Sequence, residues 1–198
     1  MSQEPKFAPT VLDKMGHVFA DDYDRLFRVV YENAVQMIGA LPLEPGEEIR
    51  NAFDHFALAS KCARDVDASP PPPQIEIDKS RERAWTNIEQ ARRHIIAGSF
   101  YCVEHQLRHQ INAITRFVDA LNWAGRSRVA GFQATADSLE ARLPSALEIN
   151  IAPSTERAEI ERQTTETEAK VREITDLLAD YMQLHLDVRQ TIEGSPPA

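Results

Sequence analysis

Apolar residues recur at helical spacing through most of this chain, beginning at about residue 21. From Asp21 to Ala40 they follow one helix face, and the acids Asp21 and Asp22 are typical of a helix start. A second helix is predicted over 47–65, after a turn at Pro45-Gly46. The short turn predicts an antiparallel hairpin. Residues 1–20 carry only one short apolar patch, so we expect a flexible N-terminal arm there.

A proline-rich stretch over 68–74 separates this hairpin from a much longer helical pattern. Consecutive prolines favour extended geometry, which fits either a stiff spacer or a ligand for a proline-recognising partner. The next helix is predicted from about Ser80 to Trp123, with Asp78 as its cap, and Gly98-Ser99 either kinks it or divides it in two. A shorter helix over 128–143 precedes Pro144 and an irregular connection.

The C-terminal segment 154–193 has apolar or small residues at alternating spacings of four and three, with Ser154 as a plausible cap. This heptad pattern predicts one long helix, which either pairs with another molecule or packs on its own domain. His185 within the pattern is interpreted as a polar residue that sets the register. The heptad positions are Ile160, Thr164, Thr167, Val171, Ile174, Leu178, Tyr181, His185, Val188 and Ile192.

These patterns together predict an all-α, up-down helical bundle over 21–150, followed by the long C-terminal helix. The 198 residues suffice for one core, and because no apolar run is present we expect neither a signal peptide nor a membrane-spanning helix. The cysteines, Cys62 and Cys102, form neither a disulfide framework nor a zinc spacing. We therefore expect a cytoplasmic protein.

The net charge of -9 is unevenly distributed, which changes the picture of possible partners. Residues 81–128 carry eight arginines against four acids, whereas 154–198 carry five basic residues against ten acids. On the long central helix, basic and amide side chains share the face opposite the apolar one. This stripe either contacts the phosphate backbone of RNA or is an ordinary solvated face. It comprises Arg83, Asn87, His94, His105, Arg108, His109, Asn112 and Arg116.

Two constellations on the predicted helices carry candidate chemistry. Cys102, His105 and His109 fall at i, i+3 and i+7, a spacing that a metal could use, but a further ligand at matching spacing is missing, so no metal or other cofactor is expected. In the second helix, Arg50-Asn51 is followed by His55, on the side opposite Ile49 and Phe53.

The arrangement Arg50-Asn51-x-x-x-His55 resembles the R-x4-6-H signature of the HEPN-domain ribonucleases, a family of all-helical proteins. The resemblance implies a metal-independent endoribonuclease in which two such motifs meet across a dimer interface. His55 would transfer the proton, Arg50 would stabilise charge on the scissile phosphate, and Asn51 would orient the histidine. The face with His55, Leu58 and Cys62 would be shared between subunits.

Two functions follow from these patterns. The first is a HEPN-type ribonuclease acting on RNA as a homodimer, such as a toxin or defence effector. Its candidate RNA-binding residues are Arg83, His94, His105, Arg108, His109 and Arg116. The alternative is a non-catalytic helical interaction or regulatory subunit that docks a protein partner through 154–193. Convergence of Arg50 and His55 from neighbouring subunits in a polar, basic cleft would favour the enzyme, whereas their separation on open surface would favour the interaction subunit.

Overall fold

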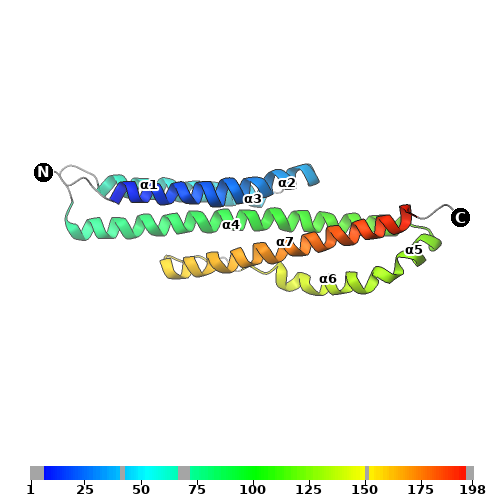
Figure 1. The fold of residues 1–198 in the computed structure, drawn as a ribbon. Helices are drawn as coiled ribbons and strands as arrows, with labels where there is room; N and C mark the ends of the chain where they lie inside the picture. Colours follow the sequence, from blue (N-terminus) through cyan, green and yellow to red (C-terminus); the bar gives the residue numbers. More distant parts are fainter. Residues whose placement is uncertain (1–6, 41–42, 67–71, 150–151, 195–198) are drawn as a thin grey trace.

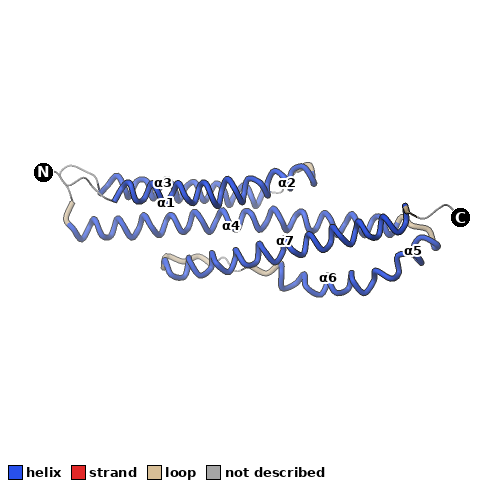
Figure 2. The backbone as a smooth tube through the Cα atoms, viewed as in Figure 1, coloured by secondary structure: helices blue, strands red, loops and turns tan. Residues whose placement is uncertain are grey.

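The computed structural model describes residues 7–40, 43–66, 72–149 and 152–194. Within these ranges the chain is helical and has no strand (Figure 1, Figure 2). The all-α bundle with a long C-terminal helix is therefore confirmed. In chain order its elements are α1 (Phe7–His17), the π-helix η1 (Val18–Arg28), α2 (Val29–Ile38), α3 (Leu43–Val66), α4 (Gln74–Asp119), α5 (Trp123–Val129), the 3-10 turn η2 (Ala130–Phe132), α6 (Gln133–Ala146) and α7 (Arg157–Glu193).

The N-terminal helices α1, η1 and α2 follow one another without a break and form one rod along α3 and α4 (Figure 1). The expected flexible arm is wrong for residues 7–20, which are helical and bury Val11 and Val18 in the core. The predicted start at Asp21 and Asp22 is also wrong, because both lie inside η1. The rod ends at Gly39, whose φ of 86° is a left-handed conformation that glycine adopts without strain.

The antiparallel hairpin predicted for the N-terminal half is confirmed. Met15 lies opposite Ser60 and Phe19 lies opposite Phe53, so the first rod and α3 run in opposite directions. The second helix begins four residues earlier than expected, at Leu43, because Pro45 is tolerated in a first helical turn. The predicted proline spacer falls partly on 67–71, which lie outside the described residues.

The central helix α4 is continuous over 46 residues, or about 70 Å, and runs the length of the molecule (Figure 1). Its N-cap is Pro73 and not Asp78, which instead accepts a hydrogen bond from Gln74 within the first turn. At Gly98 the helix neither kinks nor divides in two. A Cβ at Gly98 would lie 3.1 Å from the Phe27 ring, so glycine allows the first rod to approach α4 closely.

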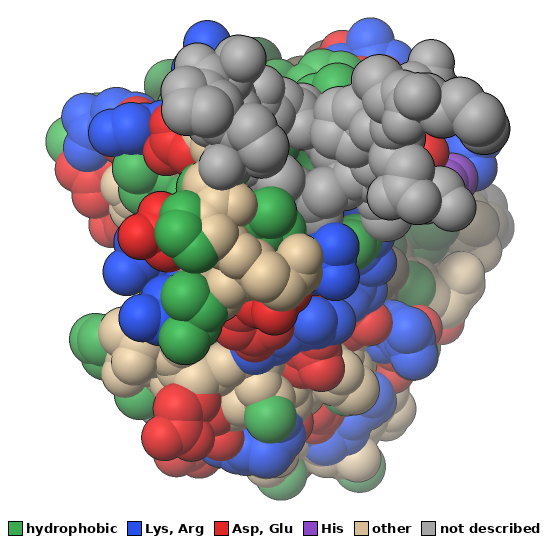
Figure 3. Space-filling model, turned by 90° about the vertical axis from the view of Figure 1, so that its left-hand side faces the viewer, with side chains coloured by type: hydrophobic (Ala, Val, Ile, Leu, Met, Phe, Trp, Pro, Cys, Tyr) green, Lys and Arg blue, Asp and Glu red, His purple; other side chains and the backbone are tan. Residues whose placement is uncertain are grey.

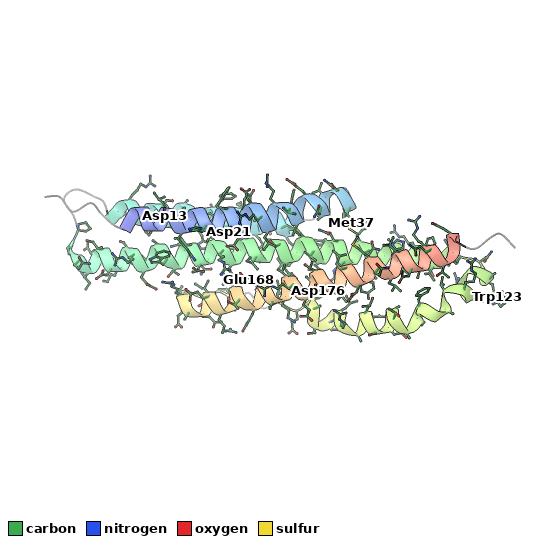
Figure 4. The ribbon with its side chains drawn as sticks, in the orientation of Figure 1. Asp13, Asp21, Met37, Trp123, Glu168 and Asp176 are labelled. Carbon is green, nitrogen blue, oxygen red and sulfur yellow. The ribbon has the colours of Figure 1, made fainter. Side chains whose placement is uncertain are left out.

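The helix α7 packs on α4 of its own chain and runs parallel to it. The pairs Arg93 with Gln163 and Gln110 with His185 advance together along both helices. The heptad residues face this contact, and all are buried except the partly exposed His185 and Ile192. The intramolecular alternative for the heptad is therefore the one that the structure adopts. Glu168, which is labelled in Figure 4, accepts a hydrogen bond from Arg92, and Arg92 also donates to Asp22 of the first rod.

The return segment between α4 and α7 differs from its prediction in detail. The long helix ends at Asp119 and not at Trp123, which instead begins the short helix α5. The next helix, α6, continues through Pro144 to Ala146, beyond the expected stop. Together α4, α6 and α7 surround a second apolar cluster, distinct from the one among the first rod, α3 and α4. The central helix thus contributes to two cores in succession.

Candidate functional site

His55 lies at the interface between α3 and the N-terminal half of α4. Its Nδ1 is 2.9 Å from Oδ1 of Asn87, and the Asn87 amide nitrogen donates to the carbonyl oxygen of Arg83 at 2.8 Å. That second bond fixes the amide orientation, so Oδ1 accepts and the His55 Nδ1 must carry the hydrogen. In the neutral ring, Nε2 is then left as the proton acceptor.

A second histidine, His94, stacks on His55 from α4. The ring centroids are 5.3 Å apart and the planes are 14° from parallel. The Nδ1 of His94 donates to Oε2 of Glu48 on α3, at 2.6 Å. Two hydrogen bonds between the helices therefore orient the stacked pair, one from each histidine. Neither Nε2 makes a hydrogen bond within the described ranges.

The surroundings of His55 keep it neutral near pH 7. Burial lowers the pKa of His55, and the neighbouring His94 and Arg93 lower this pKa further. The hydrogen bond to Asn87 and the charge of Asp54 act in the opposite direction without reversing the shift. A neutral imidazole with its Nε2 lone pair available is the protonation state that a general base needs.

A cavity of about 500 Å³ opens beside His55, between α3, α4 and the segment that leads into α7. It brings the histidine together with two cations of α4, Lys79 and Arg83. Figure 3 views the end of the molecule where α4 begins, on which basic and acidic side chains are interleaved. The remaining lining residues are Glu82, Thr86, Asn87, Gln90 and Thr155. A half-buried base beside two cations is suited to a phosphate-containing ligand.

Two buried side chains of α4 hold the far wall of this cavity in place. Gln90 donates to the carbonyl oxygen of Ser154 at 2.7 Å, and Arg93 donates to the Ala152 carbonyl oxygen at 3.1 Å and to Gln163 at 2.9 Å. Burial lowers the pKa of Arg93, while the charge of Glu48 raises it. Oε1 of Gln90 and Nε of Arg93 are buried without a hydrogen-bond partner among the described residues.

The other two residues of the motif do not join His55 in this cavity. Arg50 is exposed on α3, and five residues along a helix turn the side chain by about 140° from that of His55. Asn51 is partly buried, but the hydrogen bond that orients His55 comes from Asn87. Within the cavity lining, Arg83 is the arginine that accompanies the histidine.

The face expected to be shared between subunits is largely covered by the same chain. His55 contacts α4, and Cys62 is partly buried beside the first core, where burial raises the pKa of its thiol. Only Leu58 of the three is well exposed, at 49%. The expectation of an open face at His55 is wrong because α4 packs on the side of α3 that carries His55.

The basic stripe of α4 is divided between two environments. Asn87 and His94 point toward α3, whereas the residues farther along the helix face outward or are partly buried. Arg108 forms an ion pair with Glu104 at 2.7 Å. Cys102 is fully buried, with a thiol pKa raised by burial to about 12, and it forms no metal-binding group with His105 and His109 in the described part of the chain. His109, Asn112 and Arg116 are exposed and His105 is partly exposed.

The spacing of polar residues along α3 and α4 is the sequence signal that indicates this site. Glu48 and His55 are seven residues apart on α3, and Asn87 and His94 are seven apart on α4, so each pair shares one face. Residue spacing within each helix alone predicts His55 on the side of α3 opposite Ile49 and Phe53, and His94 on the basic stripe of α4. Two helix faces that carry polar residues at the same spacing indicate a polar contact between the helices, because the side chains of one face can hydrogen-bond those of the other.

The fold and the site together define a class: an all-helical bundle with a histidine pair in a polar cavity between its helices. Comparisons with protein families, curated proteins and solved structures find no match to this chain. Across the ranges that the structure describes, none of the helices has an apolar stretch of the length that crossing a membrane requires.

Proposed function

We propose that this protein is a metal-independent endoribonuclease of HEPN type, with His55 as its proton-transfer residue. The observation that carries the proposal is the neutral His55, held in one tautomer by Asn87 beside Lys79 and Arg83. The HEPN resemblance of the Arg50-to-His55 segment supplies the reaction class. The geometry supports a change of roles, in which Arg83 replaces Arg50 at the phosphate and Asn87 replaces Asn51 as the orienting residue.

The reaction would be an attack by the RNA on itself. Nε2 of His55 accepts the proton of a ribose 2′-hydroxyl, and the 2′-oxygen forms a bond to the adjacent phosphorus while the bond to the 5′-oxygen breaks. Arg83 and Lys79 stabilise the negative charge that develops on the phosphate. The leaving 5′-oxygen takes a proton from water, which gives a 2′,3′-cyclic phosphate and a 5′-hydroxyl. His94, held by Glu48, is a positioning residue for His55.

We propose that the active form is a cytoplasmic dimer. The part of α3 that remains open carries Arg50, Leu58 and Lys61, which are all exposed. A second copy packed on this surface would bring its own Arg50 to the interface, where the family resemblance implies that two motifs meet. The free cysteines Cys62 and Cys102 are compatible with a reducing compartment.

The test is cleavage of single-stranded RNA and transfer RNA by the full chain in excess EDTA. His55→Ala should reduce the rate by about 100-fold or more, because general-base catalysis contributes about 10²–10⁴. It should leave RNA binding largely intact. His17→Ala, an exposed histidine of α1, is the matched control and should not change the rate.

A second pair of variants separates phosphate binding from proton transfer. Arg83→Ala should weaken RNA binding and lower its salt dependence, whereas Arg25→Ala, an exposed arginine on η1, should do neither. Light scattering on the same samples records the oligomer. Absence of cleavage, or cleavage that His55→Ala leaves unchanged, would reject the catalytic proposal.

The alternative function, a non-catalytic interaction subunit, rests on a different surface. Although the heptad face of α7 is buried, Met182 and Leu186 are exposed at 46% and 51%, one turn apart on its outer side. A protein partner docked on 154–193 would use this outer face. Retained partner capture by a His55→Ala protein, with no cleavage by the wild type, would favour this function.

A further inference from the structure

A second cavity lies in the opposite half of the molecule, between α4, α7 and the segment from α5 to α6. Its volume is about 290 Å³, near the lower limit of small-molecule pockets. The floor is formed by buried side chains, Val129, Leu184 and Val188. The walls are the partly buried Ile114, Val118, Phe132 and Ala136. The deep part of the cavity is therefore entirely aliphatic and aromatic.

The rim of this cavity carries one fixed positive charge. Arg126 is exposed, and its guanidinium donates to two carbonyl oxygens at the C-terminal end of α4, through Nε to Leu121 at 3.1 Å and through Nη2 to Asp119 at 2.7 Å. These bonds hold the group in place, and Nη1 makes no hydrogen bond to the described residues. Within the described ranges, Arg126 has no carboxylate at ion-pair distance, in contrast to Arg108 and Arg142. The exposed Gln133 completes the rim.

We propose that this cavity binds a medium-chain carboxylate, with the alkyl chain against Val129, Leu184 and Val188 and the carboxylate on Arg126. The planar guanidinium matches a carboxylate, and the charge at the rim is otherwise unneutralised. The volume fits a chain of about eight carbons better than a long-chain lipid. This site is independent of the proposed nuclease cavity, which lies near the other end of α4. In Figure 4, Trp123 marks the end of the molecule that holds the carboxylate site.

The first experiment is titration calorimetry of the full chain with butyrate, hexanoate, octanoate and palmitate. Affinity should rise about fourfold for each added methylene until the cavity is full, because each buried methylene contributes a constant increment. Octanoate should bind more tightly than both butyrate and palmitate. Absence of octanoate binding, or no dependence on chain length, would overturn the proposal.

Two variants assign the two ends of the ligand. Arg126→Gln should lower octanoate affinity at least tenfold and leave the binding of octanol unchanged. Arg116→Gln removes an exposed arginine of α4 outside the cavity lining and should affect neither ligand. Ala136→Phe should fill the cavity and abolish both. Its control, Ala134→Phe, places the same side chain on the exposed side of α6.

Circular dichroism melts of each variant show whether the bundle is intact. Octanoate binding that survives both Arg126→Gln and Ala136→Phe in folded proteins would place the ligand elsewhere and overturn the proposal. Equal loss of octanoate and octanol in Arg126→Gln would reject the carboxylate contact and leave an apolar crevice that another protein's side chain could fill.

Discussion

The central helix makes two interfaces of different character, one with α3 and one with the second half of α7. Against α3 and the segment before α7, its apolar contacts are accompanied by a polar set, in which Asn87, Gln90, Arg93 and His94 all make hydrogen bonds. Against the second half of α7, the buried residues are almost all Ile, Leu, Val or Tyr. The same helix therefore provides a site at one end and a stabilising core at the other.

The contrast has an energetic consequence. A buried polar group must keep its hydrogen bonds or cost free energy, whereas an apolar contact stabilises in proportion to the area it removes from water. The polar part of the α3–α4 interface thus contributes less to stability for its size than the α4–α7 interface. In exchange, it holds a neutral histidine beside two cations, which an apolar interface cannot do.

The largest expected effect is on the apolar interface. Leu177 is fully buried on α7, so Leu177→Ala should lower the free energy of unfolding by about 2–5 kcal/mol through lost burial and a cavity. Leu186→Ala on the exposed side of the same helix should cost about 0.5 kcal/mol or less. Urea unfolding followed by circular dichroism measures both. Equal losses would mean that the outer face of α7 is also buried, as in an oligomer.

A smaller loss is expected at the polar interface. Arg93→Ala leaves the Ala152 carbonyl oxygen and the buried Gln163 without their donor, which should cost about 1–3 kcal/mol. Arg172→Ala is the control, because that side chain is exposed and lies 3.9 Å from its ion-pair partner Glu168, so the expected change is about 0.5 kcal/mol or less. A loss at Arg93 as large as that at Leu177 would contradict the contrast between the interfaces.

The sequence predicted the helices much better than it predicted their contacts. Local periodicity suffices to predict the long helices, since each has an apolar residue every three to four positions. It failed at the ends, where Asp78 and Asp21 resemble caps but lie inside helices. A residue of capping type starts a helix only if the preceding segment is not already helical. Before Asp21 the segment is helical because Val11 and Val18 are packed in the core.

For the site, sequence supplied one residue and missed its partners. His55 was chosen for its spacing from Arg50, yet it contacts Asn87 and His94, which are more than thirty positions away. Which of its faces a helix turns toward a neighbour depends on the whole packing arrangement. The pattern of α3 alone predicts that the His55 side faces outward, although polar residues of α4 cover it.

The smallest expected effect is the loss of folding stability that one histidine from each interface causes as the pH falls. Burial lowers the pKa of His55 at the polar interface and that of His185 at the apolar one, where Gln110 contacts its Nδ1 at 2.7 Å. Both titrate near 6.5 when the chain is unfolded. Below that pH the unfolded chain binds more protons than the folded one, so stability is fully present above about 6.5 and is lost as the pH falls through the folded values. Asp22, whose pKa is raised by burial, acts in the opposite sense at lower pH.

Urea midpoints at pH 7.5 and 5.5 should therefore be closer together in His55→Gln and in His185→Gln than in the wild type. The two changes should add in the double variant, because the sites share no contact. His17→Gln, an exposed histidine, is the control and should retain the wild-type difference. If the difference between the two midpoints shrinks more in His55→Gln than in His185→Gln, the polar interface desolvates its histidine more strongly than the apolar one does. An unchanged difference in the double variant would assign the acid sensitivity to other groups.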